Sequence, residues 1–257
     1  MKNMTCIAHR GASGHEPENT LLAIQKALDL GAKWVEIDVY PVENELVVIH
    51  VGKCGGSTVM ATLHRNLPEV YGAVRHVHMR AAEYDPTKRY VIVVRNPIRR
   101  FISAYHWRRR LVVGTQEQHQ RFVGEHALLT KFRSVSELAD ALAANNRLLS
   151  TDPSSGQYIH HITEGIDYHL GTFLDKCSPE HIVGVICTET LERDMLALFR
   201  TPAAGHLKNN AAHYSAELSD STRAQLRAYL TLDYKCLTKL HDMGCMSNEQ
   251  YDTVAGA

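Results

Sequence analysis

Hydrophobic residues along the chain follow two patterns. Short apolar runs rich in β-branched residues are typical of buried parallel strands, whereas apolar positions three or four residues apart are typical of helices. Strands are therefore expected at residues 5–8, 34–40, 46–51, 73–79, 90–94 and 181–187. Helices are expected at residues 19–30, 58–67, 134–149 and 219–240, and others begin at Pro97 and near Glu189. Strands that alternate with helices predict an α/β fold with a parallel central sheet flanked by helices.

A glycine-rich loop follows the apolar strand at residues 46–51, within the stretch LVVIHVGKCGGST that ends at Thr58. Glycines let backbone N–H groups approach an anion, and the next helix presents its positive N-terminal end. Lys53 adds a mobile positive charge. Because Lys53 precedes Gly55 and Gly56, the order differs from that of a nucleoside-triphosphate loop, in which the Lys directly follows the last Gly. The stretch therefore predicts a phosphate-binding loop of another kind.

A second motif, RNPIRRFISAY, begins where the strand at residues 90–94 ends. Asn96 is a good N-cap and Pro97 a good first residue of a helix. Arg95 then stands at the end of the strand, and Ser103 lies inside the helix. A guanidinium supplies a planar set of donors and a serine supplies a hydroxyl, so the two side chains can bind one phosphate from two sides.

Together, the two motifs resemble those of sulfotransferases that use 3′-phosphoadenosine 5′-phosphosulfate (PAPS), especially the carbohydrate-type and bacterial branch. The resemblance covers about residues 46–244 and implies a P-loop-like sulfotransferase fold, PAPS as co-substrate and no required metal. It implies that Lys53 stabilises the bridging oxygen and that Arg95 and Ser103 bind the 3′-phosphate. The family commonly has Pro at the position of Gly52. The residues that it implies for the 5′-phosphosulfate are Gly52, Lys53, Cys54, Gly55, Gly56, Ser57 and Thr58.

A general base for the acceptor hydroxyl is the least specified part of the site. The stretch HMRAAE resembles a region of carbohydrate-type sulfotransferases in which the His serves as the base, and this implies His78. The chain has 16 histidines, so other bases stay open. They are His76, which shares a strand face with His78, and also Glu83, His160 and His161.

Residues 7–50 resemble the start of glycerophosphodiester phosphodiesterases. The resemblance implies acid/base roles for His9 and His50, a phosphate contact for Arg10, and divalent-metal binding by Glu36 and Asp38. That family needs a complete (β/α)₈ barrel of about 250 residues. We therefore expect a truncated phosphodiesterase-like β-α-β segment at residues 1–45 and a sulfotransferase domain at residues 46–257. The join within one strand indicates a gene fusion or an engineered chimera.

Composition narrows the range of partners. Lys and Arg total 28, as do Asp and Glu, so no global basic field favours nucleic acid. Six cysteines without CxxC spacing indicate free thiols in a reducing cytoplasm. No apolar run has the length of a signal peptide or a membrane span, so we expect a cytoplasmic protein without a membrane span. The basic run at residues 108–110 is typical of a solvated face, or else contacts an anionic acceptor.

The expected reaction is transfer of a sulfuryl group from PAPS to a hydroxyl of a small molecule or glycan, with a carbohydrate favoured by the resemblance. Acceptor contacts are expected from loops such as residues 114–136. Two alternatives remain. One is a metal-dependent glycerophosphodiester phosphodiesterase that uses Glu36 and Asp38, and the other is a non-catalytic nucleotide-binding fusion protein.

Overall fold

The computed structural model describes residues 7–16, 21–37, 45–66, 71–203 and 218–256. The chain divides into two compact units, Met1–Glu43 and Asn44–Ala257, and each is described by itself. Parts of the predicted elements, at residues 5–6, 19–20, 38–40 and 67, lie outside the described residues, and so does Asp38.

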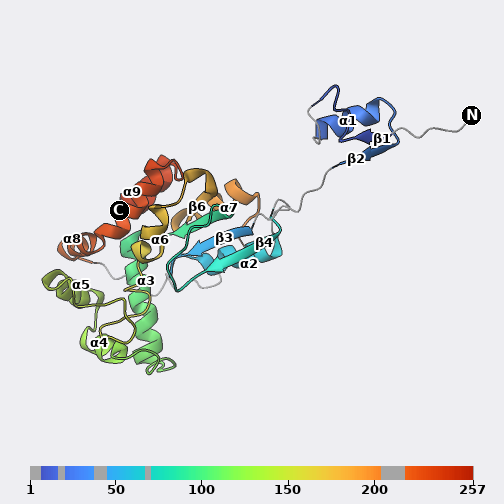
Figure 1. Ribbon diagram of the computed structural model, residues 1–257. Helices are drawn as coiled ribbons and strands as arrows, with labels where there is room; N and C mark the ends of the chain where they lie inside the picture. Colours follow the sequence, from blue (N-terminus) through green and yellow to red (C-terminus); the bar gives the residue numbers. More distant parts are fainter. Residues whose placement is uncertain (1–6, 17–20, 38–44, 67–70, 204–217, 257) are drawn as a thin grey trace, which may run out of the picture. The chain divides into compact units, whose positions relative to one another are not determined.

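The first unit contains a β-α-β arrangement, as the sequence predicts. Strand β1 (Ile7–His9) pairs in parallel with β2 (Trp34–Glu36), and helix α1 (Leu21–Asp29) connects them (Figure 1). The backbone N–H of Arg10 donates to the carbonyl of Glu36 at 2.7 Å, which extends the pairing past the end of β1.

The second unit is built on a four-stranded parallel sheet in the order β4-β3-β5-β6. The strands are β3 (Glu45–His50), β4 (Ala73–Val77), β5 (Arg89–Val94) and β6 (Ile182–Cys187). The apolar side chains of β3 and β5 are almost completely buried, because both strands are interior to the sheet and helices cover both faces. The prediction of a parallel α/β sheet flanked by helices is confirmed.

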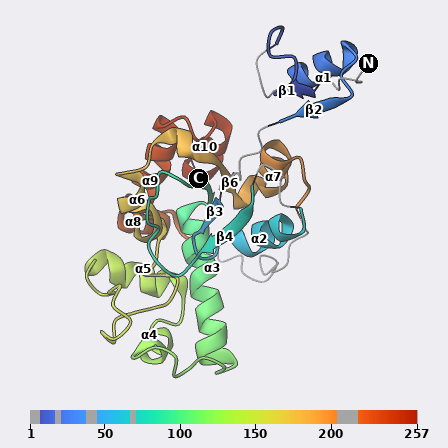
Figure 2. The ribbon, with the colours of Figure 1, turned by 45° about the vertical axis from the view of Figure 1, so that its right-hand side comes forward.

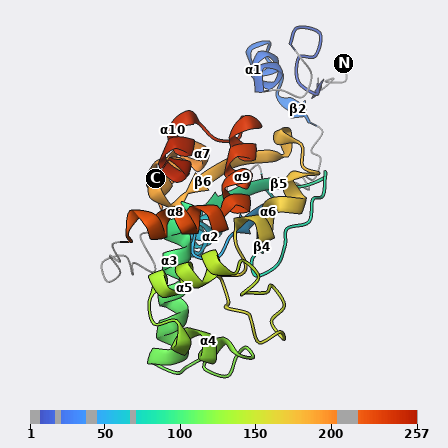
Figure 3. The same ribbon diagram turned by 90° about the vertical axis from the view of Figure 1, so that its left-hand side faces the viewer.

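Figure 2 shows α2 (Gly56–Arg65) and α7 (Leu191–Phe199) on one side of the sheet, with α6 (Ile166–Leu174) and α9 (Thr231–Asp242) on the other. All four helices contribute side chains to one core around the strands. Helix α10 (Asn248–Ala255) packs against α9, as Figure 3 shows.

A second core lies among helices beyond the sheet. It joins α3 (Pro97–Arg109), the π-helix η1 (Arg110–Gly114), α4 (Glu125–Lys131), α5 (Val135–Ala144) and α8 (Asp220–Tyr229). In Figure 1, α3 runs from the sheet toward α4 and α5. Two short 3₁₀ turns flank β6: η2 (Pro179–His181) precedes it and η3 (Thr188–Thr190) follows it.

Three details of the predicted helices are wrong. The stretch 219–240 forms two helices, α8 and α9, which separate at Leu230 and pack against different partners, α5 and α6. The helix predicted to reach residue 149 ends at Ala144, and the segment 114–136, expected as a loop, contains α4. Within the described residues, no helix is long and apolar enough to cross a membrane, and the five cysteines there are free thiols, as expected. The cytoplasmic location stays a prediction.

Candidate active site

The loop after β3 turns sharply into α2. Lys53 and Gly55 both adopt left-handed backbone conformations, with φ of 70° and 79°, and Gly55 is the N-cap of α2. A β-carbon makes this conformation unfavourable, so it suits Gly55 and strains Lys53. The loop is tied to the end of β6, because the Thr188 hydroxyl lies 2.7 Å from the Cys54 carbonyl oxygen. This backbone presents the N-terminal end of α2 at the carboxyl edge of the sheet.

The second motif folds as its sequence predicts. The Asn96 side chain accepts a hydrogen bond from the backbone N–H of Arg99 at 3.0 Å and caps α3, whose first residue is Pro97. Arg95, at the end of β5, donates from Nη1 to the Lys53 carbonyl at 3.3 Å, so it joins the two motifs directly. The Arg95 Nε atom is buried without a hydrogen-bond partner. This atom lies 3.9 Å from a Glu189 carboxylate oxygen, and the Arg95 side chain as a whole is 21% exposed. The motif therefore places a partly exposed guanidinium beside the loop.

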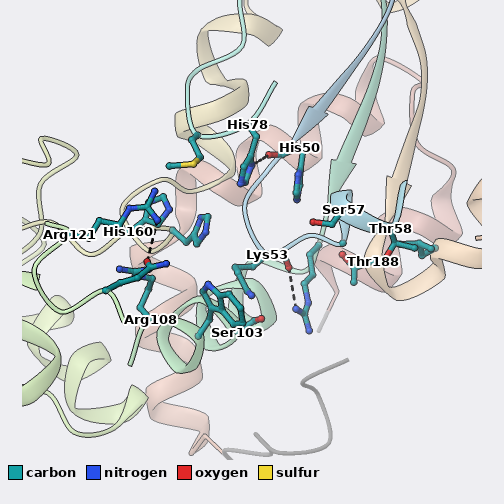
Figure 4. A pocket seen from close by; sticks show the side chains of 17 residues that line it. His50, Lys53, Ser57, Thr58, His78, Ser103, Arg108, Arg121, His160 and Thr188 are labelled. Carbon is teal, nitrogen blue, oxygen red and sulfur yellow. Dashed lines mark hydrogen bonds between the residues drawn. The ribbon is translucent and has the colours of Figure 1, made fainter. Parts of the chain in front are cut away.

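A cavity of about 300 Å³ lies between the two motifs (Figure 4). None of its 17 lining residues is an Asp or Glu, whereas four are Lys or Arg and four are His. Figure 4 shows Ser57, Thr58 and Thr188 on one side of Lys53 and Arg108, Arg121 and His160 on the other. The predicted site residues that line the cavity are Lys53, Gly55, Ser57, Thr58, His78, Arg95 and Ser103.

His78 is held by the end of β3. Its Nδ1 atom lies 2.9 Å from the carbonyl oxygen of His50, an arrangement in which Nδ1 carries the proton and the ring lone pair is on Nε2. This is the tautomer that a base needs. His160 and His161 also line the cavity, whereas His76 and Glu83 do not. Of the open alternatives for the base, the geometry therefore retains His78, His160 and His161.

Comparison with known proteins accounts for this pair of motifs. The model of the Sulfotransferase family matches residues 38–238, most of the chain. The chain belongs to the sulfotransferase family. Members of this family are PAPS-dependent enzymes. The roles of the individual residues in this sulfotransferase stay predictions.

The N-terminal segment has a second set of relatives. The model of the Glycerophosphoryl diester phosphodiesterase family matches residues 9–50. A glycerophosphodiester phosphodiesterase of Caldanaerobacter subterraneus is 51% identical over 45 residues, 17% of this chain and 18% of that protein. One of Bacillus altitudinis is 44% identical over 58 residues, 22% and 24% of the two chains. The uncharacterised protein YqiK of Bacillus subtilis is 52% identical over 45 residues, 17% and 18%.

The sulfotransferase thus spans about a fifth of the length of these curated relatives. No solved structure matches the chain. In the first unit, His9 Nε2 lies 3.3 Å from a Glu36 carboxylate oxygen, and both side chains are largely exposed. Neither of the two groups of potential metal ligands found among the described residues includes His9 or Glu36. Only a fragment of the phosphodiesterase arrangement is therefore present in the described part of the chain.

Three residues of the loop that were predicted to bind PAPS do not line the cavity. Gly52 is buried against the His161 ring, and a β-carbon built on it would overlap Nδ1. Gly56 lies beneath His50, with a built β-carbon 2.7 Å from Nδ1. Cys54 is completely buried, and burial raises the pKa of its thiol to about 12. These positions shape the backbone of the loop, and any contact they make with PAPS would be through main-chain atoms.

The prediction of a solvated basic face is wrong for Arg108. Its side chain is 1% exposed and forms a bidentate ion pair with the buried Glu125, with N–O distances of 2.8 and 2.6 Å. Arg108 also donates to Gln118 Oε1 at 2.6 Å. Arg110 is exposed and lies over the Trp107 ring, 4.5 Å from its centroid. The buried member of the run therefore positions the wall of the cavity, and the exposed one follows the prediction.

A buried hydrogen-bond network supports His160 and His161. Tyr158 lies 2.8 Å from both His160 Nδ1 and Glu164 Oε1, and the backbone N–H of His161 donates to Glu164 at 3.1 Å. Burial alone would raise the pKa of Glu164, but the bonds from His160 and Tyr158 outweigh it and lower the pKa to about 2. Burial, with nearby cations, lowers the pKa of His161 well below its usual value. His161 is therefore neutral at pH 7.

The sequence did not single out several lining residues. Lys53 Nζ lies 4.3 Å above the Trp107 ring, a cation–π contact that holds the ammonium inside the cavity. Thr188 directly follows β6. Its position at the carboxyl end of a buried parallel strand could have indicated a site residue from the sequence. Gln118 and Arg121 come from the segment in which acceptor contacts were expected.

Proposed function

We propose that this sulfotransferase transfers a sulfuryl group from PAPS to a hydroxyl of a carbohydrate or another hydroxyl-bearing small molecule. The observation that carries the proposal is the convergence of both motifs on one cavity without acidic lining residues, in a chain of the sulfotransferase family. Such a cavity suits a ligand with several negative charges, because no carboxylate among these residues would repel it.

The donor end is assigned to the loop and to the second motif. We assign the 5′-phosphosulfate to the N-terminal end of α2, with hydroxyls from Ser57 and Thr58. Backbone N–H groups at a helix N-terminus bind anions without a dedicated side chain. We assign the 3′-phosphate to Arg95 and Ser103. Both side chains line the same cavity, which supports this assignment, since guanidinium and hydroxyl groups donate hydrogen bonds to phosphate oxygens.

The transfer step is assigned to Lys53 and His78. PAPS supplies the sulfuryl group, whose bond to the phosphate oxygen breaks as a bond forms to the acceptor oxygen. Lys53 would stabilise the charge that develops on the phosphate oxygen. His78 would take the acceptor proton at Nε2, with the imidazole oriented by the His50 carbonyl. The products are the sulfated acceptor and adenosine 3′,5′-bisphosphate.

The acceptor and the location are proposals with narrower support. A carbohydrate acceptor rests on the resemblance to the carbohydrate-type branch. Gln118 and Arg121 line the cavity and add polar groups that can bond sugar hydroxyls. A cytoplasmic location rests on the five free cysteines among the described residues, because free thiols persist in reducing compartments.

Calorimetric titration of adenosine 3′,5′-bisphosphate tests the donor site. We expect micromolar binding that a chelator does not abolish. Arg95→Ala should weaken it by about 1.5–3 kcal/mol, the value of a charge-assisted hydrogen bond. Arg99→Ala is the matched control, because Arg99 belongs to the same motif, is exposed on α3 and does not line the cavity. Equal affinity in the two variants, or no binding to the folded wild type, would overturn the assignment.

Turnover separates the remaining alternatives. Release of adenosine 3′,5′-bisphosphate from PAPS in the presence of a glycan mixture should disappear in His78→Ala, while bisphosphate affinity persists. A non-catalytic nucleotide-binding protein would bind without turnover in the wild type as well. A metal-dependent phosphodiesterase would instead hydrolyse glycerophosphodiesters and lose that activity with chelator.

A further inference from the structure

Three histidine side chains meet where β3 and β4 end. His50 is the last residue of β3, His76 lies on β4, and His78 follows it. One ring nitrogen from each lies within 4.8 Å of the others. His50 Nδ1 and His76 Nε2 are only 2.9 Å apart, and Figure 4 shows the rings of His50 and His78 side by side. The ends of two hydrogen-bonded strands therefore hold three potential metal ligands together.

The arrangement of these side chains suits an ion that enters from solvent. The His50 ring is buried against Gly56 and is fixed by the loop, whereas His76 is exposed. The rings are stacked, with centroids 4.2–5.4 Å apart. Imidazole lone pairs lie in the ring planes, and the His50 and His78 rings are only 14° from parallel. Binding one ion at the ring edges therefore requires the exposed His76 and the half-buried His78 to rotate until their nitrogens point at the same place as that of His50. Three imidazoles with a fourth position for water form a donor set that Zn²⁺ commonly accepts.

A second histidine group is a weaker candidate. The ligand atoms of His160, His161 and Glu164 also lie close together, and all three are buried. However, His160 Nδ1 lies 2.8 Å from Glu164 Oε2 and 2.8 Å from the Tyr158 hydroxyl. An ion would have to displace these short contacts inside the protein. At the strand ends an ion would displace the 2.9 Å contact between His50 and His76, but His76 is exposed and can move into solvent, so the comparison favours that group.

We propose that His50, His76 and His78 bind a divalent transition-metal ion of the Zn²⁺ type and that the bound ion inhibits sulfuryl transfer. Metal binding rests on the proximity of three imidazole nitrogens and on the exposure of His76, independently of the reaction. Inhibition rests on the proposed function, because the ion would occupy the nitrogen with which His78 accepts the acceptor proton. The site is thus a point at which metal availability would regulate the enzyme.

Zn²⁺ titration of the full chain, purified with chelator and then freed of it, tests the site. We expect one ion per chain by calorimetry. Substituting an outer residue that orients a metal ligand commonly costs 10–100-fold in affinity. Loss of a ligand should cost at least as much, so His76→Gln should weaken binding by about tenfold or more. His126→Gln, an exposed histidine on α4, is the matched control and should bind as the wild type does.

Three results would overturn the metal site. The first is an unchanged Zn²⁺ affinity in His76→Gln. The second is a loss of Zn²⁺ affinity in His161→Gln while His76→Gln binds normally. The third is thiolate charge-transfer absorption when Co²⁺ replaces Zn²⁺, which would show that cysteines bind the ion. Retained affinity for adenosine 3′,5′-bisphosphate would show that His76→Gln is folded. If it is not, imidazole nitrogen spectra of the wild type decide the question, because Zn²⁺ should shift the signals of three histidines.

The inhibition is read as the ratio of transfer rates with and without Zn²⁺ for each protein. We expect this ratio to approach one in His76→Gln and to stay low in His126→Gln. Inhibition of both proteins to the same extent would refute regulation through this site. Metal binding without any transfer activity would refute the proposed function and leave the metal site standing, so the two failures are distinguishable.

Discussion

Gly52 offers a sharp test of how the loop is packed. The family commonly has Pro at this position, yet a β-carbon here would overlap Nδ1 of His161 and lie 3.1 Å from Cε1. His161 cannot move aside easily. Its ring stacks on His160 with centroids 3.8 Å apart, and its carbonyl accepts a hydrogen bond from Arg100 at 2.6 Å. We therefore expect Gly52→Ala to overpack the site.

The expected magnitude follows from the cost of overpacking. Inserting a methyl group into a filled site typically costs about 1–3 kcal/mol, and we expect Gly52→Ala to lower the free energy of unfolding by that amount. In a His161→Ala background the ring is gone, so most of the cost should disappear. Ala and His at position 161 both have a β-carbon, so the strain of its positive φ of 64° is similar in both backgrounds. The predicted coupling energy is about 1–3 kcal/mol.

Urea unfolding of the four proteins of this double-mutant cycle, followed by circular dichroism, measures the coupling. Gly114→Ala is the matched control, because its nearest neighbour would lie 3.9 Å from the new β-carbon. It should change stability by less than about 0.5 kcal/mol. If the effects of Gly52→Ala and His161→Ala add within about 0.5 kcal/mol, the reasoning fails. The ring would then not fill the space above Gly52.

Two other predictions concern buried ionisable side chains. Glu125→Gln leaves the buried Arg108 guanidinium without its ion-pair partner and should lower the free energy of unfolding by about 3–5 kcal/mol. Glu117→Gln, at an exposed position, is the control and should cause almost no change. Equal urea midpoints of the two variants would refute this prediction. Burial lowers the pKa of His169 to about 4 from 6.5. The unfolded chain therefore binds more protons between these values, and stability should fall as the pH drops from 6.5 to 4, by up to about 3 kcal/mol. His169→Gln should show a smaller fall between pH 7 and pH 5, and an identical fall would contradict the buried neutral imidazole.

The parts of the structure that sequence reasoning predicted are those set by neighbouring residues. Asn96 and Pro97 specify the start of α3 by themselves, and the side chain of Asn96 makes the expected cap. The apolar runs of β3 and β5 predict buried parallel strands, and in the structure both faces of each strand are covered. In these cases the local chemistry and the tertiary structure agree.

The parts that sequence reasoning missed depend on distant residues. Arg108 stands in a run of three arginines, and only the position of Glu125 in the fold shows that it is buried. The amphipathic pattern of residues 219–240 continues through Leu230, but α8 and α9 follow different neighbours and so separate there. The contact of His161 with Gly52 joins residues far apart in the sequence, and no pattern near either of them indicates it.

His50 shows how one residue can satisfy two family patterns and serve only one fold. The two family matches overlap at residues 38–50, and the phosphodiesterase resemblance would make His50 an acid/base residue. In the structure its strand lies between β4 and β5 in the sulfotransferase sheet, and its ring packs over Gly56 and contacts His76. Its carbonyl orients His78. Both the main chain and the side chain of His50 are therefore engaged in the sulfotransferase site, and this favours sulfuryl transfer over phosphodiester hydrolysis as the chemistry of this edge of the sheet.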